Sequence, residues 1–163
     1  MKNLLPFLFC SFSFCSFAQV NTVMPQEANS FYNRAMPEIK PQVKSIIEKN
    51  ADALRGRSVN IDSLTKQLNN DKTLKGATRQ DIEAITVLIM VRISLNADTD
   101  LKNMVINMHN NDQEISHENK AERKSTQDKV DRILAHKSQI AENVSLVMKR
   151  ISGAPDVVLN PFR

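Results

Sequence analysis

A glutamate and a histidine three residues apart provide the spacing in this chain that is most typical of metal chemistry. Glu114 and His117 would share one face of a helix, and di-iron helical bundles hold their metals with this pairing. Such sites need the pairing twice, together with two further carboxylates from other helices, and the chain has one copy. Asp112 and Glu118 lie nearby, but charged neighbours are common in so polar a segment. We expect a solvated helix face here and predict no cofactor, and we keep a metal-binding helical protein as an alternative function.

Covalent and phosphate chemistry have less support. Ser116, Ser125 and Ser138 do not lie in a Gly-x-Ser-x-Gly turn, the arrangement that exposes a serine nucleophile beside its base. The chain has only three glycines, and they are far apart, so no glycine-rich loop is available to hold a phosphate. Long helices rarely provide the concave, partly apolar pocket that a pair of catalytic carboxylates needs. We predict that the protein is not an enzyme.

Residues 1–18 have the organisation of a secretory signal peptide. A positive charge at Lys2 precedes an apolar stretch from Leu4 to Phe17, and small residues at Ser16 and Ala18 match a signal-peptidase site. A membrane anchor is the alternative, but spanning a bilayer takes about 20 apolar residues. We therefore expect cleavage after Ala18, export to the periplasm or the medium, and no membrane association of the processed chain.

The exported chain would lack cysteine, carry a small net charge and have few aromatic residues. Cys10 and Cys15 both lie in the signal peptide, and each follows a phenylalanine, where a lipoprotein needs a small residue. The formal charge of +4 falls to about +3 without the signal peptide, and acidic and basic residues are interleaved. Phe31, Tyr32 and Phe162 are too few to stack bases, so we predict no nucleic-acid partner.

Helices are predicted for most of the exported chain. Residues 19–36 are polar and are predicted to form a flexible N-terminal arm, with at most one helical turn around Glu27 to Arg34. An apolar period of three to four residues behind two prolines predicts a helix over about residues 38–54. A cap at Asn60 predicts a second helix over about 60–70. The C-terminal tail, residues 154–163, is short and apolar, and we expect it to dock on the rest of the chain.

A run without glycine or proline, residues 77–152, dominates a helical domain that we expect to span residues 37–153. Glycine and proline are the strongest helix breakers, so their absence predicts one or two very long helices over about residues 79–152. Thr78 and Asp81 resemble a capping box at the start of the run. Basic residues followed by glycine are the expected stop signals at its end.

The start of this run, from Ile82 to Leu95, is apolar on almost every side, so one stripe against one partner would not cover it. Burial in the middle of the chain's own helical bundle is the first interpretation, and an interface with another molecule is the second. Insertion into a membrane is the third, but the stretch is short and contains Arg92. The candidate interface residues are Ile82, Ile85 and Ile89.

The segment that follows, residues 109–129, has Ile115 as its one large apolar residue. It therefore has no face to bury. It is either a solvated helical span that projects from the body or the site of a hairpin turn, and we expect the break at residues 110–112.

The last part of the run repeats its apolar residues every 3.5 residues over three heptads, which is typical of a coiled-coil seam. Lys137 interrupts the seam with a polar group of the kind that costs stability but fixes register or partner number. The seam can pack against the chain's own residues 82–108 or against another molecule. The candidate interface residues along it are Val130, Ile133, Lys137, Ile140, Val144, Val147 and Ile151.

Together these patterns predict an all-α fold behind a cleaved signal peptide, either an elongated helical bundle or a long helical hairpin with coiled-coil character. We expect a non-enzymatic exported helical interaction protein, structural, chaperone-like or secretion-associated. Its partner would be a protein, either a second copy in a homo-oligomer or another exported protein. Two alternatives stay open: a metal-binding helical protein that uses Glu114 and His117, and a secreted membrane-active effector.

Overall fold

The protein is all-helical in the part of the chain that the structure describes. The computed structural model describes residues 23–112, 120–151, 159 and 162–163. The elements in order are α1 (Gln26–Glu38), α2 (Pro41–Ala53), α3 (Ile61–Asn69), the 3-10 turn η1 (Lys72–Leu74), α4 (Arg79–Asp112) and α5 (Lys120–Arg150). No β-strand occurs in these described residues. The predicted all-α class is confirmed, and the predicted signal peptide lies outside the described residues.

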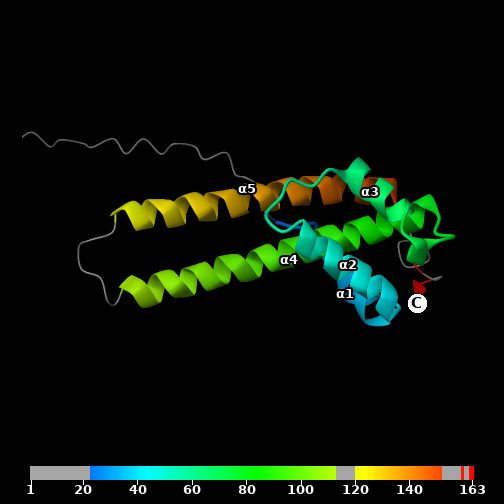
Figure 1. Ribbon diagram of the computed structural model, residues 1–163, viewed down its shortest axis with the longest axis horizontal. Coiled ribbons are helices and arrows are strands. Elements are labelled where there is room, and N and C mark those ends of the chain that lie inside the picture. The colour runs from blue at the N-terminus through cyan, green and yellow to red at the C-terminus, as the bar shows by residue number, and fades with distance from the viewer. Residues whose placement is uncertain (1–22, 113–119, 152–158, 160–161) are drawn as a thin grey trace, which may run out of the picture.

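Two long antiparallel helices, α4 and α5, form the axis of the molecule (Figure 1). They contain 34 and 31 residues, which corresponds to roughly 45–50 Å each at 1.5 Å per residue. α4 ends at Asp112, in the polar stretch where the sequence predicts a break, and α5 begins at Lys120. The residues between them, 113–119, lie outside the described chain.

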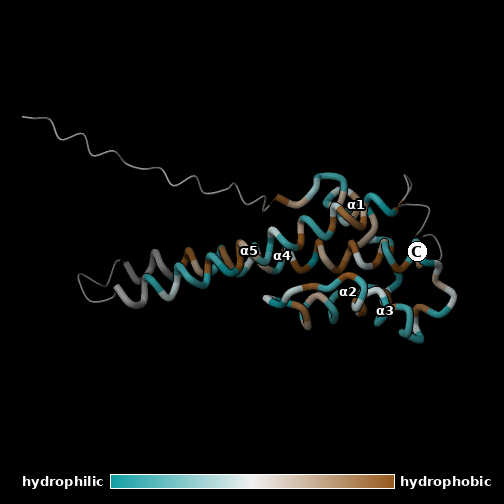
Figure 2. The backbone as a smooth tube through the Cα atoms, turned by 90° about the horizontal axis from the view of Figure 1, so that it is seen from above, coloured by the Kyte–Doolittle hydropathy of each residue, from teal (hydrophilic) through white to brown (hydrophobic). Residues whose placement is uncertain are grey.

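The three shorter helices pack around one end of this pair. In Figure 2, which views the molecule from above, α1 lies on one side of the α4–α5 pair and α2 and α3 lie on the other. The opposite half of the pair extends past the short helices as two helices alone (Figure 1). We call the end with five helices the body.

The first half of α4 supplies the centre of the core. Every residue from Asp81 to Val91 is buried, and α1, α2, α3 and α5 all contact α4. A helix that is apolar on all sides is stable in water only when neighbours surround it. The stretch from Ile82 is therefore part of the chain's own core, which is the first of the three interpretations drawn from the sequence.

The structure corrects the flexible arm expected over residues 19–36, of which it describes residues 23–36. Residues from Gln26 onward form α1, and Ala28, Phe31 and Ala35 on that helix are fully buried. These residues recur every three to four positions, so they form one narrow apolar stripe. The stripe is easily missed among polar residues, yet it suffices because α1 covers only one side of the α4–α5 pair.

The ends of the helices follow the predicted capping signals. Asn60 Oδ1 accepts a hydrogen bond from the Ser63 N–H at 2.8 Å and caps α3. At the start of α4, the Thr78 N–H donates to Asp81 Oδ2 at 2.7 Å, and the Asp81 N–H donates to Thr78 Oγ1 at 3.1 Å. This reciprocal pair is a capping box, and it satisfies two amide groups that the helix itself leaves unpaired.

The described residues of the C-terminal tail dock on the body, as the sequence predicts. Leu159 and Phe162 are buried. The Lys40 N–H, between α1 and α2, donates a hydrogen bond to the Phe162 carbonyl at 2.7 Å. The end of the chain is thereby fixed to the connection between the first two helices.

Candidate functional site

The residues predicted to face a partner lie mostly inside the protein's own core. Seven of them are at most 4% exposed: Ile82, Ile85, Ile89, Ile140, Val144, Val147 and Ile151. The other three, Val130, Ile133 and Lys137, are half-buried and lie nearer to the start of α5. The structure brings the two predicted stretches together, but against each other, and a partner cannot reach the seven buried positions in the folded chain.

Ion pairs mark the place where the body ends. Lys137, the polar residue in the seam, pairs with Asp98 across the α4–α5 pair, and Arg55 after α2 pairs with Asp100. The hydrogen bond to Asp100 raises the pKa of Arg55 above its ordinary value. The Lys137 side chain is only 12% exposed, so its methylene stem is covered while its ammonium group reaches Asp98. Sliding one helix along the other would break the Lys137–Asp98 pair, which therefore favours the observed register.

Beyond these ion pairs, α4 and α5 form a two-helix projection, which we call the arm and define as residues 101–112 and 120–136. Val105 and Ile106 on α4 are 61% and 45% exposed. The core stripe continues into the arm through residues that are only half-buried: Leu101, Met104, Val130 and Ile133. Two helices cannot enclose a core as five do, so the arm keeps apolar surface in contact with water.

One titratable group at the base of the arm lacks a partner. The Nε2 atom of His136 is buried and has no hydrogen bond with any described residue. Partial burial lowers the pKa of His136, because the charged imidazolium loses solvation there. The sequence alone does not distinguish His136 from His109 or His117, since the burial of its ring depends on the packing of other helices.

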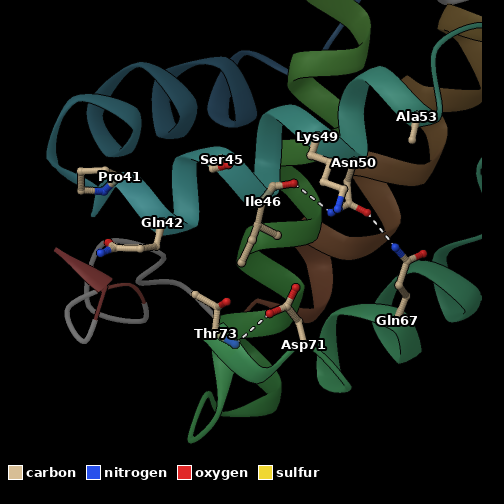
Figure 3. A pocket seen from close by; sticks show the side chains of 10 residues that line it. All are labelled: Pro41, Gln42, Ser45, Ile46, Lys49, Asn50, Ala53, Gln67, Asp71 and Thr73. Carbon is tan, nitrogen blue, oxygen red and sulfur yellow. Dashed lines mark hydrogen bonds between the residues drawn. The ribbon is translucent and has the colours of Figure 1, made fainter.

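A polar groove of about 650 Å³ lies on the body between α2 and the segment formed by α3 and η1 (Figure 3). One wall is a face of α2 that includes Gln42, Ser45 and Lys49. The facing wall includes Gln67 and Asp71. Sequence reasoning missed this groove because the α2 residues have the pattern of an ordinary solvated helix face, and only the position of α3 makes it concave.

Hydrogen bonds fix the floor and the far wall of the groove (Figure 3). Asn50 Nδ2 donates to the Ile46 carbonyl at 2.8 Å, and Asn50 Oδ1 accepts from Gln67 Nε2 at 3.0 Å. Asp71 Oδ1 accepts the Thr73 N–H at 2.8 Å. Asn50 is only 9% exposed, so the amide bridge from α2 to α3 is held in place before any ligand binds.

The predicted metal site lies outside the described residues, since Glu114 and His117 fall within 113–119. Among the residues that the structure does describe, no group of three or more His, Cys, Asp or Glu side chains is placed to hold a metal ion. Of the described helices, none has an apolar stretch long enough to cross a bilayer.

Comparison of the chain with protein-family models, with curated proteins and with solved structures gives no match. Function must therefore be inferred from the chain's own surface. Two features of the described surface carry the proposals that follow, the apolar arm and the polar groove.

Proposed function

We propose that the protein is exported and acts, without catalysis, by binding another protein along its arm. The observation that carries this proposal is the exposure of Val105 and Ile106 on an element only two helices thick. Large apolar side chains exposed close together on a helix are typical of protein-binding sites. The organisation of residues 1–18 supports export.

The contact would have coiled-coil character. The 3.5-residue repeat of α5 continues into the arm, where Val130 and Ile133 are half-buried although Ile140 and Val144 are fully buried. A partner helix laid along the arm would cover its half-buried apolar residues much as the short helices cover α4 in the body. The partner that fits is therefore an exported protein with an amphipathic helix, and self-association is the alternative outcome of the test.

Site-specific photo-crosslinking in the producing cells tests this proposal. A photoreactive residue at position 106 should give a covalent adduct of one defined mass, and the same residue at exposed Lys149, at the body end of α5, should not. The adduct should disappear when Val105→Asp is added. An adduct of twice the protomer mass would identify a second copy as the partner, and light scattering of the purified protein checks that result. Equal labelling from positions 106 and 149 would refute arm-specific binding.

Two aspartate substitutions separate binding from folding. Ile106→Asp places a charge on the surface and should leave the helical circular dichroism signal intact while removing partner binding. Ile89→Asp buries a carboxylate at a position with 0% exposure, which costs several kcal/mol against a total stability of about 5–15 kcal/mol. The second variant should therefore unfold. If the Ile89→Asp variant instead folds and loses partner binding, the interface lies on the first half of α4 and not on the arm.

A further inference from the structure

The α2 wall of the polar groove has three side chains that nothing in the described chain engages. Gln42, Ser45 and Lys49 are spaced by three and four residues, so they lie along one face of α2. None of the three side chains makes a hydrogen bond or ion pair with another described residue. An amide, a hydroxyl and an ammonium group are thus presented in a row to one side of the groove.

The facing wall complements this row. The Gln67 amide spends one donor on Asn50 and keeps the other, and Asp71 keeps one carboxylate oxygen beyond its bond to Thr73. Ile46 provides an apolar surface between the two walls. The groove therefore has donors and acceptors on both sides of an apolar floor, with one cation on the α2 wall and one anion opposite.

This combination selects among ligand classes. No aromatic side chain lines the groove, so sugars and nucleobases would find no stacking surface. One lysine facing one aspartate gives no surplus of positive charge for a phosphate-rich polymer. The Gln42 amide and the Ser45 hydroxyl can pair with the N–H and C=O groups of a peptide backbone, each of which needs a partner when it leaves water.

The dimensions agree with a short extended peptide. The lining residues of α2 run from Pro41 to Ala53, which is about 18 Å at 1.5 Å per residue. An extended chain rises roughly 3.3 Å per residue, so five or six residues fit along this wall. Lys49, which has no partner among the described residues, lies toward one end of the row and favours a negative group in the ligand.

We propose that the groove between α2 and the α3–η1 segment binds an extended peptide segment, with a carboxylate of that segment at Lys49. The inference rests on the proposed function in that the ligand is a protein, and it adds a second contact on the body. The carboxylate has two sources, an acidic side chain within the segment or the free C-terminus of a chain.

Titration of the processed full chain with three synthetic pentapeptides, followed by ¹H–¹⁵N NMR, tests the proposal. All three are N-acetylated and built of alanine and serine. The first has an internal aspartate and an amidated C-terminus, and the second has a free C-terminus and no acidic side chain. The third is neutral, with an amidated C-terminus and no acidic side chain. Amide shifts should concentrate in residues 42–53, 67 and 71–73. At least one carboxylate peptide should bind about tenfold more tightly than the neutral peptide, and the stronger of the two identifies the source.

Matched lysine variants decide whether Lys49 is responsible. Lys49→Ala should reduce the affinity of the preferred peptide about tenfold and leave the neutral peptide unaffected. Lys66→Ala removes the same charge from an exposed position on α3 outside the groove and should change neither. Absence of shifts in the groove at millimolar peptide, or equal effects of the two variants, would overturn the proposal. The crosslink at position 106 is independent of both results, so failure of the groove and failure of the arm are separate outcomes.

Discussion

At the scale of single residues, His136 shows how a side chain acquires properties from helices far away in the sequence. Its ring lies at the base of the arm with Nε2 buried and without a hydrogen-bond partner among the described residues. Neutral imidazole tolerates that environment better than imidazolium, and this lowers the pKa of His136 in the folded protein.

His136 should therefore destabilise the protein in mild acid. The unfolded chain has an ordinary histidine pKa of about 6.5, above that of folded His136, so the unfolded state takes up the proton first as the pH falls. The stability present above about pH 6.5 is then lost below it. The urea concentration at the unfolding midpoint should fall between pH 8 and pH 5.5. This fall should be larger for the wild type than for His136→Gln.

Carboxylates titrate in both the wild type and His136→Gln. Their effect therefore cancels when the acid-induced change in urea midpoint of one protein is subtracted from that of the other. At pH 8 both side chains are neutral, and the comparison there gives the packing effect of the substitution alone. Parallel midpoints over the whole pH range would contradict the assigned burial of His136.

At the scale of elements, α4 is one helix with two environments. Its first half is enclosed by the other four helices, and its second half, in the arm, is paired with α5 alone. Because a helix of this kind takes most of its stability from tertiary packing, the two halves should open at different free energies.

Amide hydrogen exchange of the native protein measures that difference. Residues 82–97 should exchange only through global unfolding, at about 5–15 kcal/mol, whereas residues 101–107 should exchange through local opening at far lower free energy. In α5, the amides of residues 144–151 should likewise be more strongly protected from exchange than those of residues 124–133. Uniform protection along α4 would mean that the arm is covered in solution, and dilution of the sample would then test whether a second copy covers it.

The same contrast explains which elements are predictable from sequence. The caps at Asn60 and Thr78 are local signals, so the starts of α3 and α4 follow from them, and the absence of breakers between residues 77 and 152 accounts for the length of α4 and α5. α1 was missed because its apolar stripe is narrow and contains two alanines, Ala28 and Ala35, whose burial depends on the α4–α5 pair. The polar groove was also missed, because its two walls are separated in sequence and become neighbours only in the fold.

At the scale of the whole molecule, the body is closed by the two ends of the described chain. Met24 is the first buried residue, α1 covers one side of the α4–α5 pair, and Phe162 is fixed to the α1–α2 connection.

Processing of the leader is directly measurable. Expression of the full sequence in a bacterial host should give a processed protein in the periplasm or medium. Its intact mass should equal that of a chain whose first residue is Gln19. Ala18→Arg replaces the small residue that signal peptidase requires and should leave the precursor uncleaved. A version made in the cytoplasm to begin at Gln19 should have the melting temperature of the exported protein, because a leader that is removed on export cannot contribute to the mature fold. Recovery of an exported protein that still carries residues 1–18 would refute the signal-peptide assignment, and a markedly lower melting temperature for the shortened chain would show that these residues contribute to the fold.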